Sequence, residues 1–427
     1  MNVQRVKELT RRSAITLTVL AFAIITWLPR LLDPAITGDQ LFEITAQQIL
    51  CQGEPITGWP INDNSIGTAM GTFAPTLPSY LVTRGSCWLA SLLHINGYQA
   101  FILLGISLTV LITLAASIAS GVSLIASLMI SYGLATAPCS FSRLEHVQLS
   151  QLWPIMPCIA TCSILLTRDS HPIKRGHWLY APGVSGLLIG LFSFTAQEYY
   201  AVLSIVCIFA CYCIGTANSA DAFKHGTADI TYPLAESHEK RKRWPYSRFA
   251  AGYICAMLMH LSSKQFLWNI PIWAHEATQR WPVEQFLYGF WPLNIFTSPL
   301  INNHLRESFV RAQLQVTETP FNSSSGVAVI IGLTITLANW IRLKRGNITR
   351  LSRDEALIQA FGGVLITTII IACTVATPGG LGTLFAVVIS PQLRALNRIT
   401  PYFYCAALTV CAIKLEQILI MAADDRK

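Results

Sequence analysis

The segment RRSAITLTVLAFAIITWLPR, residues 11–30, holds an unbroken run of uncharged and mostly apolar side chains between arginines. An α-helix rises about 1.5 Å per residue, so about 20 such residues can cross the hydrocarbon core of a bilayer. The segment lacks the small-residue cleavage site of a secretory signal peptide. We therefore expect it to form a transmembrane helix.

The composition of the chain fits the same class of protein. Of its 427 residues, 52% are hydrophobic and only 12% are charged, and the mean hydropathy is +0.48. Soluble domains carry about 25% charged residues, so residues 1–427 are expected to form one polytopic membrane domain. Nine cysteines lie in apolar runs, where they are expected to be small buried apolar residues, and no CxxC metal-binding pattern occurs. These are Cys158, Cys162, Cys207, Cys211, Cys213, Cys255, Cys373, Cys405 and Cys411.

Apolar runs that approach the length of a membrane span recur along the chain. They predict an all-α fold, a bundle of about ten transmembrane helices. An even number of spans returns both termini to the same side of the membrane. The predicted spans are residues 14–30, 98–118, 121–138, 151–167, 178–196, 199–216, 249–263, 325–341, 357–377 and 400–418.

Lysine and arginine are unevenly distributed between the segments that join these spans. Residues 1–13, 168–177, 217–248 and 342–355 hold 18 of the 30 Lys and Arg residues. Cytoplasmic loops carry the excess of positive charge, so these segments and both termini are predicted to be cytoplasmic. The densest basic run, HEKRKRWPYSR (238–248), is expected to set topology and to contact anionic lipid; we do not expect a nucleic-acid partner.

Two of the predicted outer loops are long enough to contain structure of their own. In the first loop, TGDQLFEITAQQILCQG and LPSYLVTRGSCWLASLL predict two helices that lie along the membrane surface. Arg84 in the middle of the second helix would be costly inside hydrocarbon. The third loop is rich in Trp and Tyr, which favour the boundary between water and lipid. The outer loops are residues 31–97, 139–150, 264–324 and 378–399.

The predicted order of elements resembles that of the GT-C superfamily of membrane glycosyltransferases. This order is one transmembrane helix, then a long outer loop that opens with an acid and holds two surface helices, and then a bundle of many helices. Four stretches are similar, in order, to bacterial polytopic proteins labelled as sugar translocases, phosphoglycerol transferases or membrane proteins. The resemblance covers most of the chain and implies a multi-pass protein of the bacterial inner membrane. The stretches are TGDQLFEI, CSFSRLEHVQLSQLWP, QRWPVEQFLYGFWPLNIF and GGLGTLFAVVISPQLRALNRI.

The resemblance implies a reaction on the outer face. A polyprenyl-phosphate-linked sugar is the donor, and the acceptor is a surface glycan, a glycolipid or a protein. Asp39 occupies the position of the general base that takes the proton of the acceptor hydroxyl, a role that suits a carboxylate in an apolar surround. Glu43, four residues on, is expected to orient Asp39 or a sugar hydroxyl. The alternative is that Asp39 caps the N-terminus of the helix it opens.

Two further groups of polar residues follow predicted spans on the outer side. Arg143 can hold a lipid phosphate, Glu145 can be a second acid, and His146 can bind either of these or a divalent cation, the one cofactor that the residues suggest. A loop whose charges satisfy one another is the alternative. Glu198 and Tyr199 can grip a sugar, with the ring stacked on its C–H face; an ordinary aromatic belt is equally compatible with this pattern.

The third and fourth outer loops contribute the remaining candidates. Arg280, Glu284 and Tyr288 can contact sugar or phosphate, although a surface ion pair between Arg280 and Glu284 explains the same spacing. In the fourth loop, Arg394, Asn397 and Arg398 fall on one helical face if that segment is helical. Two guanidinium groups on one face suit a phosphate or pyrophosphate; the alternative is that they extend toward lipid headgroups.

Motifs that the sequence lacks narrow the range of functions. We find no Walker A motif, no GxSxG, no HExxH and no Asp-x-Asp nucleotide-sugar signature. The sequence therefore favours a transferase that uses a lipid-linked donor. Two other classes of function remain open, a translocase of lipid-linked sugar and a non-catalytic subunit of an envelope glycan assembly complex.

Overall fold

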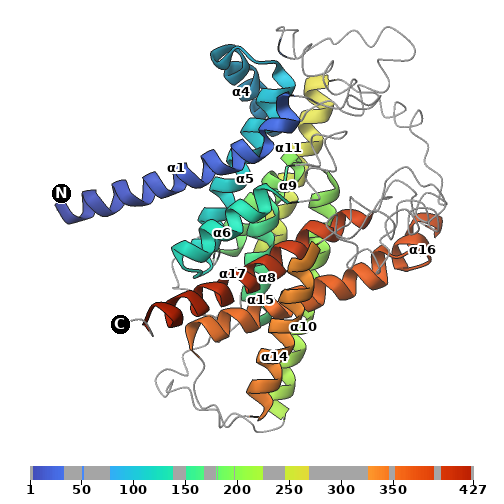
Figure 1. Cartoon of the computed structure of the whole chain (residues 1–427). Helices are drawn as coiled ribbons and strands as arrows, with labels where there is room; N and C mark the ends of the chain where they lie inside the picture. Colours follow the sequence, from blue (N-terminus) through green and yellow to red (C-terminus); the bar gives the residue numbers. More distant parts are fainter. Residues whose placement is uncertain are drawn as a thin grey trace, which may run out of the picture.

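The computed structural model describes residues 3–32, 51, 77–137, 151–167, 179, 181–196, 198–224, 246–268, 326–345, 352–388 and 396–424. This part of the chain is helical throughout, with short turns and no strand (Figure 1). The elements are α1 (Val3–Leu32), α4 (Leu77–Leu93), α5 (Gly97–Ala119), α6 (Leu124–Ala135), α8 (Ile155–Thr167), α9 (Pro182–Ala196), α10 (Glu198–Lys224), α11 (Tyr246–Trp268), α14 (Gly326–Arg345), α15 (Arg353–Ile371), η7 (Ala372–Ala376), α16 (Leu381–Val388), η8 (Leu396–Ile399) and α17 (Thr400–Asp424).

The predicted all-α fold is confirmed for these residues, and each predicted span falls on a helix. Within the described ranges, five helices are long and apolar enough to cross a membrane: Gly97–Ala119, Tyr199–Ala217, Val327–Arg345, Arg353–Ala376 and Thr400–Ala423. Other apolar helices, α6, α8 and α9 among them, are shorter. The chain is therefore a multi-pass membrane protein by its helices, while the number of about ten spans stays a prediction.

Hydrogen bonds between helix ends show which residues lie together at each end of the bundle. At one end, Gln99 Nε2 at the start of α5 donates to the Leu31 carbonyl at the end of α1 (2.7 Å). At the other end, Arg353 at the start of α15 donates to the carbonyl of Gly121, between α5 and α6 (2.6 Å). The start of α1 and the end of α17 lie on the same side of the molecule, at the left of Figure 1, and α4 and α16 lie away from it.

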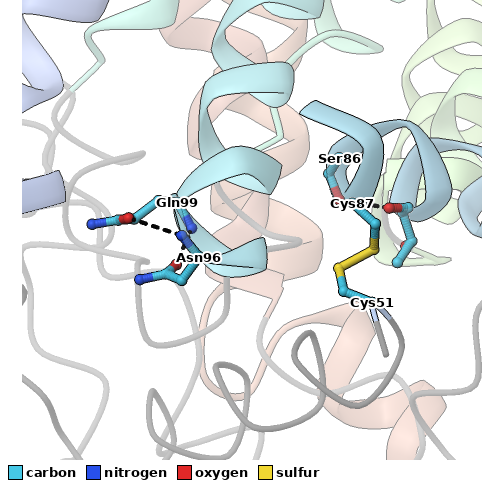
Figure 2. Close-up of a disulfide and its surroundings, with 6 residues drawn as sticks. Cys51, Ser86, Cys87, Asn96 and Gln99 are labelled. Atoms are coloured by element: carbon cyan, nitrogen blue, oxygen red, sulfur yellow. Dashed lines mark hydrogen bonds between the residues drawn. A yellow bond between two sulfur atoms is a disulfide. The ribbon is translucent and has the colours of Figure 1, made fainter. Parts of the chain in front are cut away.

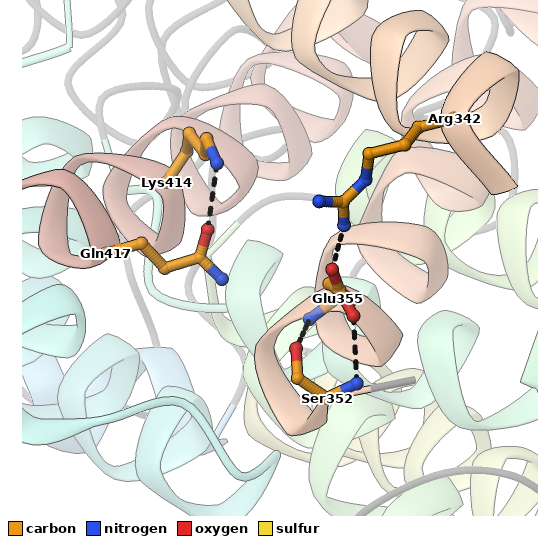
Figure 3. Close-up of polar contacts among 5 residues, drawn as sticks. All are labelled: Arg342, Ser352, Glu355, Lys414 and Gln417. Carbon is orange, nitrogen blue, oxygen red and sulfur yellow. Dashed lines mark hydrogen bonds and ion pairs between the residues drawn. The ribbon is translucent and has the colours of Figure 1, made fainter. Parts of the chain in front are cut away.

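The end that contains Arg353 is stabilised by several polar contacts. Arg342 at the end of α14 pairs with Glu355 in the first turn of α15, and Ser352 caps that helix through a reciprocal capping box (Figure 3). These residues fall in the segment predicted to be cytoplasmic. The acidic side chain in the first turn also interacts favourably with the helix dipole.

Helices α9 and α11 pack with their backbones in close contact because glycines line the interface. A Cβ atom on Gly186 would lie 2.1 Å from the Phe249 carbonyl oxygen, and one on Gly252 would lie 2.1 Å from the Gly183 carbonyl oxygen. Small residues allow helices in a membrane to approach in this way. The close approach brings the C-terminal ends of α9 and α11 together.

The segment between α15 and α17 is not a simple helical hairpin. The last turn of α15 widens into the π-helical segment η7, and Gly379 then adopts a positive φ of 77° in a turn that leads into α16. Positive φ values favour glycine, since it has no Cβ atom. Both η8 and α16 pack against η7, so this irregular segment positions the residues just before α17.

The segment predicted as the first outer loop contains a disulfide that the sequence analysis did not predict. Cys51 is bonded to Cys87 of α4, with Cα atoms 5.1 Å apart (Figure 2). The second helix predicted in this loop is confirmed as α4, with the expected bounds, while its position along the membrane surface stays a prediction. Leu81, Trp88 and Leu92 form an exposed apolar stripe on one face of it. The first predicted surface helix lies outside the described residues, apart from Cys51, and so does the third loop from residue 269 onward.

The prediction that nine cysteines are buried is only partly correct. Five of them are buried: Cys158, Cys162, Cys207, Cys211 and Cys405. Cys213 and Cys255 are exposed, however, because they lie on helix faces that no other described helix covers; Cys373 and Cys411 are half-buried. An apolar run does not distinguish the core-facing side of a membrane helix from the lipid-facing side, since both are apolar.

Candidate functional site

Most of the predicted site residues lie outside the part of the chain that the structure describes. For Glu198 and Asn397 the structure gives only the backbone, at the first residue of α10 and within η8. Tyr199 and Arg398 are described with their side chains. The residues outside the described ranges are Asp39, Glu43, Arg143, Glu145, His146, Arg280, Glu284, Tyr288 and Arg394.

The structure brings Tyr199 and Arg398 together. The guanidinium carbon of Arg398, in η8, lies 3.9 Å from the centroid of the Tyr199 ring in the first turn of α10. Arg398 is only 6% exposed. A desolvated cation on an aromatic face gains about 2 kcal/mol. Two stretches that were predicted separately as parts of a site are therefore in direct contact.

The burial of Arg398 bears on the two interpretations of this residue. A side chain that extends to lipid headgroups keeps its charged end exposed. Arg398 is buried within the bundle, which argues against this interpretation for Arg398. Arg394 lies outside the described residues, and its place on the same helical face stays a prediction.

A chain of buried hydroxyl groups fixes the backbone next to this contact. The Tyr402 hydroxyl, from the first turn of α17, donates to the Tyr200 carbonyl (2.8 Å). Its oxygen lies 2.9 Å from the Ser204 hydroxyl, which is 3.3 Å from that of Ser193 on α9. Since Tyr402 uses its proton on the carbonyl, Ser204 donates to Tyr402 and Ser193 donates to Ser204. Three helices are thus joined at one point.

Tyr200 has a structural role. Its ring is completely buried and lies 6.4 Å from the Tyr402 ring at an interplanar angle of 60°. A completely buried ring cannot face the boundary of the membrane or stack on a sugar. The predicted sugar-binding residues on α10 are therefore Glu198 and Tyr199 only. We call Tyr199 and Arg398, with the four supporting residues Ser193, Tyr200, Ser204 and Tyr402, the Arg398 site.

One buried ionisable residue was missed by the sequence analysis. His260 of α11 is 5% exposed, and its ring stacks on that of Phe194 of α9, with centroids 4.7 Å apart. Nearby, the Tyr253 hydroxyl donates to the Ala201 carbonyl of α10. The signal in the sequence was a single histidine in the apolar run YICAMLMHLSS. A lone histidine in such a run is ambiguous without its neighbours.

The described residues of the Arg398 site favour an anionic ligand. A buried guanidinium presents a fixed positive charge and fork-shaped donors, which match phosphate oxygens. Among the described residues, no group of three or more His, Cys, Asp or Glu side chains is arranged to hold a metal ion. The predicted cation at His146 lies outside this part of the chain.

Comparison of the chain with models of protein families, with curated proteins and with solved structures finds no match.

Proposed function

We propose that the protein is a membrane glycosyltransferase that moves a sugar from a polyprenyl-phosphate-linked donor to an acceptor on the outer face of the bacterial inner membrane. The observation that carries this proposal is Arg398, buried against Tyr199 at the end of the bundle where the predicted outer loops emerge. A buried guanidinium is a fixed positive charge with fork-shaped donors, and a donor phosphate has the complementary charge and geometry.

The proposed reaction uses each group in a defined way. The acceptor hydroxyl oxygen forms a bond to the anomeric carbon while the bond from that carbon to the phosphate oxygen breaks. The leaving polyprenyl phosphate takes the electron pair of the broken bond, and Arg398 stabilises the negative charge. Asp39 takes the proton of the acceptor hydroxyl. The proposal thus assigns the charge-stabilising role to Arg398, whose position the structure describes, and the role of general base to Asp39, which lies outside the described residues.

Several described hydroxyl groups in the bundle are not available to line a path for the alternative, a translocase. A polar path through the membrane needs side chains that offer their hydrogen bonds to a passing ligand. Thr109, Thr161 and Thr409 instead donate to carbonyls four residues earlier in their own helices, at 2.8, 3.0 and 2.8 Å. These hydroxyls satisfy their own helices, as is usual in membrane spans.

Transfer from polyprenyl-phosphate-linked hexoses by the purified protein tests the proposal, with membrane glycolipid as acceptor. Arg398→Lys should weaken donor binding by about tenfold or more, because a point charge does not reproduce the guanidinium fork. Arg342→Lys is the matched control, since Arg342 is exposed at the opposite end of the bundle.

Asp39→Asn should lower transfer by about 10²- to 10⁴-fold with little effect on folding. Unchanged donor affinity in Arg398→Lys, or full activity in Asp39→Asn, would contradict these assignments.

A further inference from the structure

Helix α14 is the least covered of the described helices that are long enough to cross a membrane. Only 17% of the residues in its apolar stretch are buried, compared with 39–61% in the other four. Its buried face, with Val329, Gly332 and Thr336, packs on α15 and α17. The described helices leave the rest of its surface uncovered.

This uncovered surface changes from apolar to basic at the C-terminal end of α14. Leu337, Ile341 and Lys344 are four and three residues apart, so they lie on one side of the helix, with Trp340 beside them. All four are exposed, Leu337 and Trp340 at 51% and Ile341 at 44%. Arg345 follows and is also exposed. Apolar side chains next to basic ones match a phospholipid, whose acyl chains adjoin its phosphate.

Contacts at this end determine which charges an anion can meet. The Lys344 ammonium nitrogen lies 4.3 Å from the centroid of the Trp340 ring. Tryptophan favours the boundary between water and lipid, so this contact holds the ammonium group at the level of lipid phosphates without neutralising it. Arg342 pairs with Glu355, whereas within the described ranges neither Lys344 nor Arg345 pairs with an acid.

Charge favours an anionic lipid over a second copy of the chain on this surface. Residues 342–353 contain five Lys and Arg residues and no Asp or Glu. Two copies packed through α14 about a two-fold axis along the membrane normal would bring these like charges together. An anionic lipid instead supplies the opposite charge. The positive-inside rule explains an excess of basic residues here, but it requires neither the contact with Trp340 nor the exposed apolar side chains.

We infer that the exposed surface of α14 over residues 337–345 binds an anionic phospholipid. Lys344 and Arg345 hold the phosphate, and an acyl chain lies along Leu337 and Ile341. We call this surface the α14 lipid face. It lies at the end of the bundle opposite Arg398, so the inference does not depend on the proposed function.

Fluorescence of Trp340 tests the inference, because bromine atoms on a lipid acyl chain quench a tryptophan that they contact. The purified full chain is placed in mixed micelles of detergent and phosphatidylcholine, and brominated phosphatidylglycerol or brominated phosphatidylcholine is added. The difference between the wild type and Trp340→Phe isolates Trp340 from the other tryptophans. Half-maximal quenching should need about tenfold less phosphatidylglycerol than phosphatidylcholine, since each basic residue near anionic lipid contributes about fivefold.

A pair of matched variants assigns the preference to the two basic residues. Lys344→Gln with Arg345→Gln should make the two brominated lipids quench Trp340 equally. Arg5→Gln with Lys7→Gln removes the same charge from α1, which packs on α5 and α6 while α14 packs on α15 and α17, and should keep the wild-type preference. Thermal midpoints show whether each variant is folded. A preference that survives in the first variant, or is lost equally in both, would overturn the assignment.

Two measurements on the wild-type chain need no substitution. High salt should abolish the preference for phosphatidylglycerol, because salt screens exposed charges. Equal quenching by the two lipids at low salt would mean that the surface contacts bulk lipid without selection. Quenching by neither lipid would mean that another protein surface, such as a second copy of the chain, covers Trp340. A preference that high salt does not change would also contradict the role of Lys344 and Arg345.

Discussion

Arg398 shows how a single charged residue can be kept inside an apolar bundle. The cation lies on the Tyr199 ring, and the backbone on both sides of that contact is held by the hydroxyl of Tyr402, which bonds to Tyr200 and Ser204. Tyr402 is fully buried, so water cannot replace either of its bonds. The position of Arg398 therefore depends on a residue that has no proposed role in ligand binding.

Replacing Tyr402 with Phe should lower stability. The variant removes the hydrogen bonds of the Tyr402 hydroxyl to the Tyr200 carbonyl and to the Ser204 hydroxyl, a loss of about 1–3 kcal/mol for buried groups. Tyr132→Phe is the control, because the Tyr132 hydroxyl bonds to Thr26 in an exposed position (3.1 Å) and its loss should have little effect. Thermal unfolding in detergent compares the two variants. Equal midpoints would show that the hydroxyl chain does not hold α10 against α17.

At the scale of elements, the glycines between α9 and α11 fix the distance between these helices. Two of them meet backbone atoms, which cannot move aside as a flexible side chain can. This packing places Phe194 beside His260 and brings α11 next to the start of α10, through the bond from Tyr253 to Ala201. The arrangement of α9, α10 and α11 thus depends on glycines, which have no functional side chain.

Gly252→Ala should be destabilising although alanine is the better helix former. Its Cβ atom would lie 2.1 Å from the Gly183 carbonyl oxygen and 2.9 Å from the Leu187 nitrogen, so the helices must separate, at a cost of about 1–3 kcal/mol. Gly85→Ala on α4 is the matched control: the nearest atom to its Cβ, Leu104 Cδ2, is 3.6 Å away. That change should be neutral or stabilising by up to about 1 kcal/mol. The thermal midpoint should therefore fall for Gly252→Ala and stay the same or rise for Gly85→Ala, and an equal fall in both variants would contradict the packing argument.

The helices themselves were predictable because each depends on a local run of apolar residues. LPSYLVTRGSCWLASLL was predicted as one helix, and α4 has those bounds. The contacts of the site were not predictable, since they join residues far apart in the chain: nothing near Tyr199 indicates Arg398, and nothing near Phe194 indicates His260. The pairing of Cys51 with Cys87 is of the same kind. Local composition indicates which residues form helices, and long-range packing decides which of them meet.

At the scale of the whole molecule, two independent features agree on the orientation in the membrane. The basic residues Arg342, Lys344 and Arg345 lie in the last turn of α14, at the end of the bundle predicted to be cytoplasmic. The Cys51–Cys87 disulfide lies in a segment predicted to be on the other side. Disulfides persist in oxidising compartments and are rare in the cytosol. Charge distribution and redox chemistry thus predict the same orientation by different physical routes.

Labelling of cysteines in intact cells tests that orientation. Cys51→Ser frees the thiol of Cys87, which should then react with a membrane-impermeant maleimide added from outside, while the wild-type disulfide should not react at this position. Lys240→Cys, in the basic loop between α10 and α11, should react only after the cells are lysed. Mass spectrometry of the labelled peptides separates these sites from the other cysteines. Reaction of Lys240→Cys in intact cells, or of Cys87 only after lysis, would invert the bundle and place the Arg398 site on the cytoplasmic side, where the proposed outer-face transfer could not occur.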